Sequence, residues 1–361
     1  MHISYAQESN RLDGFGIETD FLAGKIIKHS KKFTAPIPTL SSAVDLNFVW
    51  QTTGKKKWHQ SRHFPIIGLG VTYTDYGSPN VFGKCIGVYP NLQVPIIKGE
   101  KIEWTLRVGD GIGYVTKKNQ KTNPIDTLNT AIGSHINDFA MIITDLRWHI
   151  NKHWDMQIGG NFTHISNGDY RQPNLGVNFA GGHVGVRYFP STSKPIPFID
   201  SNLKPLPKRW LVEMRLGLAY NEARTPGNPE EPTYIASVYA SRRWRGKNKY
   251  FFGSDYSYHT NNYDDLVYWS KFKGHEADYA WYGAFFAGNE YLIGRLGIVF
   301  QVGVYYHQIY LKLDPYYEKI GWNYYIIKKE KGVFKNVFVS GFLKTHAIIA
   351  EFAEFGIGAG F

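Results

Sequence analysis

The sequence predicts an all-β protein, an antiparallel transmembrane β-barrel of about 14–16 strands. Apolar and polar residues alternate along many segments, as they do when successive side chains of a strand point to opposite faces. Aromatic residues make up 16% of the 361 residues, and glycine is abundant at 37. No window of about 18 uninterrupted apolar residues occurs, so transmembrane helices are not expected. A barrel needs only alternate apolar residues, which agrees with the negative mean hydropathy.

The final segment, 349–361, illustrates the alternation. A soluble β-sandwich is the alternative interpretation, but segments of about ten to fourteen residues suit tilted membrane strands better than typical soluble ones. The chain also ends in a strand whose last residue is Phe361, which resembles the end of outer-membrane barrels. One face of this segment holds Ala353, Phe355, Ile357, Ala359 and Phe361, and the other holds Glu354, Gly356, Gly358 and Gly360.

Sixteen segments carry the strand pattern, with fourteen as the alternative count. We expect a short N-terminal segment over 1–13 and a single β-barrel domain over 14–361. The expected strands are 14–28, 42–53, 64–76, 81–97, 101–116, 133–150, 154–166, 176–189, 210–224, 232–245, 249–261, 278–287, 291–310, 317–327, 333–345 and 349–361.

The connections alternate between tight turns, such as Gly288-Asn289, and longer loops, such as 117–132. Outer-membrane barrels have short periplasmic turns and longer outer loops, so 167–175 is expected to be an outer loop. Two connections, 54–63 and the proline-rich 190–209, are longer than this rule allows. We interpret 190–209 as an extended turn rather than a linker between domains.

The net charge of +11 comes from basic residues that fall mostly in the connections, for example Lys117-Lys118 and Lys328-Lys329. Solvated loop ends explain most of this charge, and attraction to phosphorylated lipid headgroups is the second interpretation. Nucleic acid is not an expected partner. Cys85 is the only cysteine, so no internal disulfide is possible. The start at Met1 has no apolar signal region, so an export signal is expected to have been removed or to lie upstream.

A histidine and a serine lie two residues apart at the end of the expected strand 154–166. His164 and Ser166 continue its apolar face, and Asn178 continues the apolar face of the next strand. The Cα atoms of His164 and Ser166 would lie about 6.6 Å apart, which two side chains can bridge. A serine nucleophile needs a base and a third group to orient that base, here Asn178. Asn167 and Gly168 would supply oxyanion donors. The alternative is a polar girdle at the membrane interface.

This region resembles the lipid A 3-O-deacylase (PagL-type, acyloxyacyl hydrolase) family. The resemblance rests on His164-Ile-Ser-Asn-Gly, Pro173-Asn174-x-Gly176-x-Asn178 and Gly185-Val-Arg-Tyr. It implies an outer-membrane barrel that cleaves the acyl ester at the 3 position of lipid A without a cofactor. It also implies that His164 is the base, that Ser166 is the nucleophile, and that Asn167 and Asn174 belong to the oxyanion region. The rest of the chain is similar to longer, Bacteroidetes-type members, whereas characterised members have about eight strands.

One residue departs from the family pattern. Where the characterised enzymes carry a glutamate, this chain has Asn178. Asparagine orients a histidine but does not stabilise an imidazolium by charge, and in a serine protease the change from Asp to Asn cost about 10⁴ in rate. Asp169 in the adjoining loop is the alternative third residue.

Other polar patterns predict structure rather than chemistry. Gly109-x-Gly111-x-Gly113 is a row on the lumen side, and Glu351 and Glu354 are expected in the lumen. Cys85 is expected to pack in the interior. His29, His59, His63 and His346 have no metal-ligand spacing, and Trp50, Trp104, Trp148 and Trp210 fit interfacial girdles.

The leading hypothesis is an esterase in the outer membrane of a Gram-negative bacterium, with lipid A or lipopolysaccharide as its partner and its site facing the outer leaflet. The alternative is a catalytically impaired member that serves as a structural or accessory barrel in an assembly with other outer-membrane proteins. A porin-like channel is a third possibility, and it predicts an open lumen. None of the three requires a metal or another cofactor.

Overall fold

The computed structural model describes residues 12–28, 30–52, 54, 56–121, 125–191, 209–225, 229–244, 247–311, 314–329, 331–347 and 349–361. Sixteen strands dominate it, and every strand pair is antiparallel. This confirms the predicted all-β class and the count of sixteen strands. Within the described ranges, no helix has the length and apolar character needed to cross a membrane.

The first eight strands cover the N-terminal half of the chain, and one short helix, α1 (Lys57–Ser61), lies in the connection after the second strand. This helix accounts for the unexpected length of the 54–63 connection. The strands are β1 (Phe15–Ile27), β2 (Ser41–Gln51), β3 (Ile66–Ser78), β4 (Gly83–Ile97), β5 (Ile102–Val115), β6 (Ile136–His149), β7 (Trp154–Ser166) and β8 (Val177–Tyr188).

The remaining strands cover the C-terminal half, with two helices, α2 (Thr260–Tyr268) and α3 (Glu276–Tyr279), in one connection. The strands are β9 (Trp210–Glu222), β10 (Glu230–Trp244), β11 (Asn248–His259), β12 (Trp281–Ile293), β13 (Leu296–His307), β14 (Tyr316–Lys328), β15 (Asn336–His346) and β16 (Ile349–Gly360).

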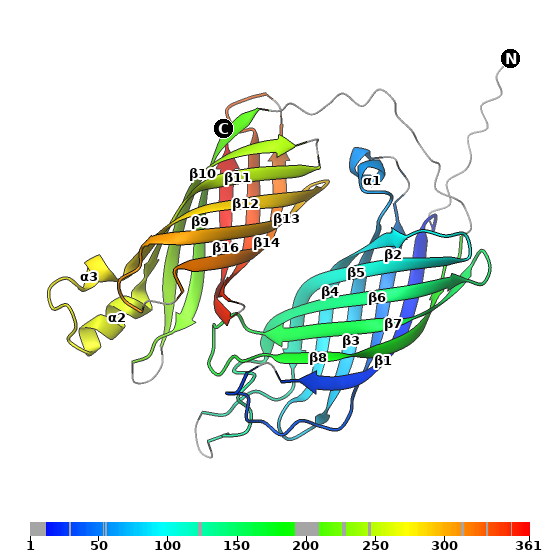
Figure 1. The fold of residues 1–361 in the computed structure, drawn as a ribbon, viewed down its shortest axis with the longest axis horizontal. Helices are drawn as coiled ribbons and strands as arrows, with labels where there is room; N and C mark the ends of the chain where they lie inside the picture. Colours follow the sequence, from blue (N-terminus) through cyan, green and yellow to red (C-terminus); the bar gives the residue numbers. More distant parts are fainter. Residues whose placement is uncertain are drawn as a thin grey trace. The chain divides into compact units, whose positions relative to one another are not determined.

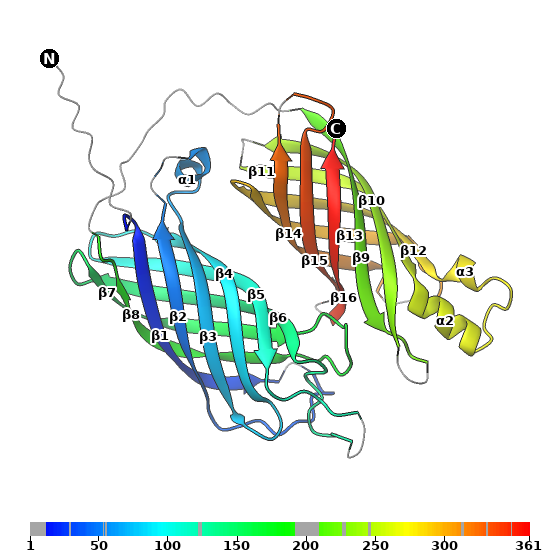
Figure 2. The ribbon, with the colours of Figure 1, turned by 180° about the vertical axis from the view of Figure 1, so that it is seen from behind.

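The sixteen strands close as two barrels of eight (Figures 1 and 2). Strand β8 pairs with β1, from Ile17 opposite Tyr188 to Ile27 opposite Asn178, and β9 pairs with β16. The chain accordingly divides into two compact units. The prediction of one barrel domain over 14–361 is therefore wrong. One barrel of sixteen strands and two barrels of eight have the same strand lengths and the same alternation. The two arrangements differ only in which strands pair at the edges of each sheet.

The sequence predicts an extended turn over 190–209 rather than a linker. Its flanking strands β8 and β9 belong to different barrels, so the segment joins two closed sheets and that interpretation is wrong. Residues 192–208 themselves lie outside the described residues. A second correction concerns the turn expected at Gly288-Asn289. Strand β12 continues to Ile293, and the turn falls at Gly294 instead.

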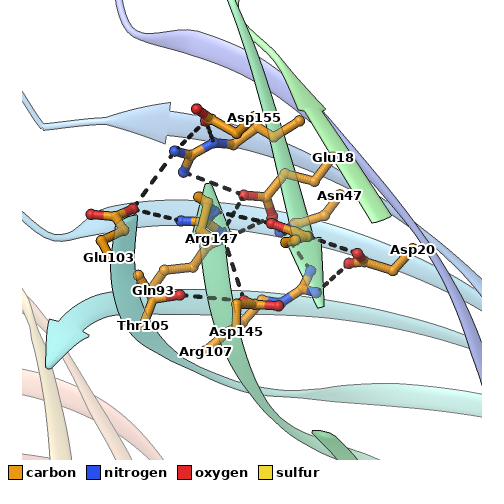
Figure 3. A network of polar contacts seen from close by, with 12 residues as sticks. Glu18, Asp20, Asn47, Gln93, Glu103, Thr105, Arg107, Asp145, Arg147 and Asp155 are labelled. Carbon is orange, nitrogen blue, oxygen red and sulfur yellow. Dashed lines mark hydrogen bonds and ion pairs between the residues drawn. The ribbon is translucent and has the colours of Figure 1, made fainter. Parts of the chain in front are cut away.

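Charged side chains fill the interior of the first barrel (Figure 3). The guanidinium of Arg107 binds Asp20 at 2.7 Å and Asp45 at 2.9 Å. The guanidinium of Arg147 binds Glu103 at 3.0 Å and Glu18 at 3.2 Å. Both arginines are completely buried, so each charge depends on these partners for compensation. The network occupies the space that a channel would need.

The second barrel is filled in the same way by a different set of residues. Lys249 binds Glu213 at 3.1 Å and Glu290 at 2.6 Å. Lys319 binds Asp255 at 2.9 Å and Glu354 at 3.1 Å. A cavity bordered by Lys249 and Lys319 holds only about 20 Å³, which is room for about one water molecule. The open lumen predicted by the porin-like hypothesis is absent from the described part of both barrels.

The outer surfaces of both barrels are apolar. Trp50, Trp104, Trp148 and Trp210 are between 43% and 56% exposed, as expected for side chains in contact with lipid. The row of Gly109 and Gly111 faces inward, where Cβ atoms would collide with Tyr89. Polar residues on the outer surface are therefore exceptions that need an explanation, because placing them against hydrocarbon is costly.

Candidate functional site in the first barrel

The hairpin of β7 and β8 carries the predicted histidine and serine on its outer surface. Exposed and buried residues alternate along β7, with Trp154, Met156 and Ile158 exposed. His164 and Ser166 continue that outward set by position, with His164 half-buried and Ser166 covered at 4% exposed. On β8, Asn178 is the direct cross-strand partner of His164. All three residues therefore lie on the same face of the sheet, as the alternation of the sequence predicts.

The three side chains form one chain of hydrogen bonds. The Ser166 Oγ lies 2.9 Å from His164 Nε2, and His164 Nδ1 lies 2.6 Å from Asn178 Oδ1. An amide oxygen only accepts, so Nδ1 must carry the ring proton that it donates. Nε2 then presents its lone pair to the Ser166 hydroxyl. This is the tautomer that a general base needs to take the serine proton.

A glycine makes room for the histidine ring. Gly176 has φ of 75°, in the left-handed region that favours glycine. A Cβ atom there would lie 2.7 Å from His164 Cε1. Its backbone N–H donates to Ala131 O at 2.9 Å, which ties the start of β8 to the β5–β6 connection. The glycine of the Asn174-x-Gly176-x-Asn178 motif is thus required for the position of the ring.

The two expected oxyanion asparagines contact each other. The Asn167 backbone N–H donates to Asn174 Oδ1 at 2.8 Å, and the Asn167 side chain donates to Ser134 Oγ at 3.0 Å. Asn174 thereby holds the 167–175 loop closed beside Ser166. Ser134 did not stand out in the sequence, because it lies 32 residues before Ser166 in another connection. The oxyanion roles of Asn167, Gly168 and Asn174 stay predictions.

The alternative third residue, Asp169, makes a different contact. Gly168 and Asp169 both have positive φ, 63° and 67°, so the chain turns sharply after β7. The Asp169 carboxylate accepts a hydrogen bond from the Gln172 side chain in its own loop. The Nδ1 atom of His164 is bound by Asn178 instead. The structure thus brings Asn178, and not Asp169, to the position expected for the third residue.

The other polar residues considered in the sequence analysis lie in surroundings typical of residues that stabilise the fold. Cys85 is buried in the core of the first barrel. His346 Nε2 contacts Glu351 at 2.8 Å inside the second barrel. Burial, together with the nearby Lys56, lowers the pKa of His59 in α1, so this ring is neutral at pH 7. His29 lies outside the described residues. Within the described part of the chain, no three His, Cys, Asp or Glu side chains are grouped to hold a metal ion.

Two models of known families match the chain. Residues 42–187 match the family model "Lipid A 3-O-deacylase (PagL)". Residues 210–361 match the model "Acyloxyacyl hydrolase, C-terminal domain". The chain belongs to the lipid A 3-O-deacylase (acyloxyacyl hydrolase) family. Membership of this family places it in the outer membrane of a Gram-negative bacterium, with a lipid A deacylase domain in its N-terminal half. No curated protein matches the chain.

Solved outer-membrane proteins resemble parts of this deacylase-family chain. The outer membrane enzyme PagL is 16% identical, with 48% of this chain and 98% of that chain covered and a TM-score of 0.31. Neisserial surface protein A is 10% identical, with 49% and 97% covered and a TM-score of 0.35. OccAB3 of Acinetobacter baumannii is 9% identical, with 96% and 98% covered and a TM-score of 0.25.

Proposed function

We propose that this chain is an outer-membrane esterase that removes an ester-linked acyl chain from lipid A by a serine–histidine mechanism. The observation that carries the proposal is the hydrogen-bonded chain from Ser166 through His164 to Asn178 on the outward face of β7 and β8. An acyl-chain substrate in the membrane reaches this surface without leaving the bilayer. A purely structural barrel has no need of a polar chain there, and exposing one to lipid is costly.

The geometry accommodates a two-step acyl transfer. Ser166 Oγ attacks the ester carbonyl carbon while His164 Nε2 takes the hydroxyl proton. The tetrahedral intermediate then breaks its bond to the sugar oxygen, which receives that proton from Nε2. In the second step Nε2 deprotonates a water molecule that attacks the acyl-serine. The fatty acid leaves, and the Ser166 hydroxyl is restored. No cofactor is needed at any step.

Asn178 orients the histidine and fixes its tautomer, but its neutral amide does not stabilise the imidazolium as a carboxylate would. We therefore expect a slow enzyme, because replacement of the acid by an amide in a serine triad lowered the rate by about 10⁴. A residual rate is still expected, since binding and oxyanion stabilisation contribute independently of the triad.

The site would face the outer leaflet. It lies beside the 167–175 loop, and the long β5–β6 connection contacts it through Ser134 and Ala131. This connection also contains the exposed Lys117 and Lys118. Their charges would attract the phosphates of lipid A toward this end of the barrel.

The test is mass spectrometry of lipid A from cells that express the wild-type chain, Ser166→Ala or Ser257→Ala. Ser257 is the matched control, because it also binds a histidine at 2.9 Å but lies inside the second barrel. We expect loss of one ester-linked chain with wild type and Ser257→Ala, and intact lipid A with Ser166→Ala. Intact lipid A in all three strains, at equal amounts of folded protein, contradicts the esterase.

A second candidate is a structural or accessory barrel of an outer-membrane assembly. Asn178 favours it, and so does the second barrel, whose serine–histidine pair is directed into the lumen rather than toward the membrane. In that case lipid A is unchanged by expression of the chain. Crosslinking in intact outer membranes would then recover the same partner proteins with wild type and with Ser166→Ala.

A further inference from the structure

One end of the second barrel carries a group of basic side chains around the opening of its lumen. The strands that meet there are joined by short connections, such as Gly294-Arg295 between β12 and β13, so this is the periplasmic end. The C-terminus lies at the same end (Figure 1). Among the described residues, no acidic side chain lines the cavity at this opening. We call the opening the basic mouth, and its polar residues are Arg209, Ser241, Arg243, Lys249, Lys329 and Lys335.

Two pairs of like charges face each other at the basic mouth. Arg243 on β10 is the direct cross-strand partner of Lys249 on β11. Across the β14–β15 connection, the Lys329 backbone N–H donates to Lys335 O at 2.8 Å, so these two lysines are also neighbours. Like charges directly opposite each other destabilise a sheet. Two such pairs in one opening therefore cost stability, and the fold alone gives no reason for them.

The carboxylates near the basic mouth compensate only one of its cations. Lys249 binds Glu213 at 3.1 Å and Glu290 at 2.6 Å. Within the described part of the chain, Arg243 and Lys329 form no ion pair with either carboxylate. Their charges are therefore available to an anion from outside the protein.

The same end of the first barrel is built differently. There Arg187 binds Asp155 at 2.6 Å, and His149, the last residue of β6, also meets Asp155, at 2.7 Å. Arg147 binds Glu103 at 3.0 Å. Each of these basic side chains has a carboxylate partner. Unpaired positive charge at the periplasmic end is therefore not a general requirement of such a barrel, and the basic mouth is a feature of the second barrel.

The donors of the basic mouth match the chemistry of a phosphate group. Arg243 supplies a planar fork of N–H donors, and Lys329 and Lys335 supply compact ammonium charges. These side chains come from β10 and from the β14–β15 connection and line one cavity. A phosphate group carries up to two negative charges and three acceptor oxygens, so it can accept from several of these donors at once. A carboxylate offers one charge and two oxygens.

The basic mouth also adjoins the lipid-facing surface. Arg209 directly precedes Trp210, which is 54% exposed on the outside of β9. The Arg242 guanidinium lies over the Trp210 ring, 5.6 Å from its centroid. Tryptophan at the end of a membrane strand is typical of the interface with lipid headgroups. The opening is therefore within reach of inner-leaflet headgroups as well as of soluble molecules in the periplasm.

We propose that the basic mouth of the second barrel is a binding site for a phosphate ester, with Arg243 and Lys329 as its principal contacts. The phosphate belongs either to the headgroup of an inner-leaflet phospholipid or to a soluble ester of the periplasm. Its negative charge offsets the repulsion between the paired cations. The proposal is independent of the esterase, because Ser166 lies on the first barrel.

The experiment measures binding to the full chain in neutral detergent micelles by isothermal titration calorimetry. The probes are inorganic phosphate, dioctanoyl phosphatidylglycerol and acetate. The test variant combines Arg243→Gln with Lys329→Gln. The matched control combines Lys117→Gln with Lys118→Gln, which removes the same charge from an exposed connection of the first barrel. Melting curves with and without phosphate check the folding of each protein.

We expect wild type and the control to bind inorganic phosphate alike, and the test variant to bind it at least tenfold more weakly, as for loss of hydrogen bonds to a charged group. Acetate should bind wild type at least tenfold more weakly than phosphate. Phosphate should raise the melting temperature of wild type but not of the test variant. Without phosphate, the test variant should melt no lower than wild type, because the like-charge repulsion is relieved.

The two phosphate probes distinguish the sources of the ligand. Tighter binding of phosphatidylglycerol than of inorganic phosphate assigns the site to a lipid headgroup, and any other order assigns it to a soluble ester. The proposal is overturned if wild type binds neither probe, if the test variant binds phosphate as wild type does, or if acetate binds as tightly as phosphate. A lower melting temperature of the test variant without phosphate also overturns it, because the cations would then stabilise the fold.

Discussion

Each barrel contains a histidine and a serine two residues apart, with the hydroxyl 2.9 Å from Nε2, yet their surroundings are opposite. His164 and Ser166 lie on the outer surface of β7. Ser257 and His259 point into the second barrel; Ser166 is covered as completely as Ser257, at 4% against 5% exposed, so the two serines differ in direction and not in exposure. A hydrogen-bonded serine–histidine pair therefore does not identify a catalytic site. The face of the strand on which it lies decides whether the pair is directed toward the membrane or toward the lumen.

The third group also differs between the two pairs. His164 Nδ1 is 2.6 Å from the Asn178 amide oxygen, whereas His259 Nδ1 is 3.5 Å from the Thr233 hydroxyl. The His259 ring also packs against Tyr282, with ring centroids 4.4 Å apart. The first pair has a fixed tautomer and lies on the outward face of its strand, with Ser166 itself 4% exposed. The second pair is part of the polar filling of a lumen.

The largest effect is expected from removal of each histidine in turn. His164→Ala should lower the deacylation rate at least 10³-fold, because loss of a triad member leaves only binding and oxyanion stabilisation. His259→Ala should leave the rate within twofold and lower the thermal stability of the barrel instead. Initial rates on purified lipid A, with melting curves of both variants, check this. Equal rate losses would mean that the comparison of the two pairs is mistaken.

A carboxylate at position 178 should increase the difference in activity between the two serine–histidine pairs. Asn178→Asp would place a negative charge beside His164 Nδ1 and stabilise the imidazolium formed during attack. We expect the rate to rise at least tenfold, with about 10⁴ as the upper limit from the known effect of the reverse change. Thr233→Val, the matched change at His259, should alter no rate. A rate that falls in Asn178→Asp would argue that the amide itself is required.

A smaller effect is expected from crowding the catalytic ring. Gly176→Ala adds a Cβ that would meet His164 Cε1 at 2.7 Å, so the ring must move. Misplacement by about 1 Å costs on the order of 10²-fold in rate. The control is Gly160→Ala on the same outward surface, where the nearest atom is 3.7 Å away. Rates for both variants, compared with their melting temperatures, separate loss of positioning from loss of folding. Equal activity of the two variants would rule out the proposed role of Gly176.

The local alternation of apolar and polar residues was sufficient to predict the strands and the strand face on which the site residues lie. Alternation located β7 at 154–166 without error, and counting by twos placed His164, Ser166 and Asn178 on one face. The turn between β12 and β13 was misplaced because Gly288-Asn289 looks like a turn. In the structure Gly288 continues the strand, and the Phe251 ring packs where its side chain would be.

Local alternation does not predict contacts between segments that are distant in the sequence. Ser134, in the β5–β6 connection, contacts Asn167 next to Ser166, and Asp138 lies opposite Ser166 in the β6–β7 register. Neither residue belongs to a local motif. Their polar character was visible in the sequence, but no spacing linked them to the serine.

The sequence by itself determined the class of the protein, because side chains two apart in a strand must share a face, and lipid requires that face to be apolar. It also determined the His164–Ser166–Asn178 surface. Only the tertiary structure decided that sixteen strands close as two barrels and that the lumens are filled. Closure depends on which edge strands find each other across the length of the chain, and alternation contains no information about that choice.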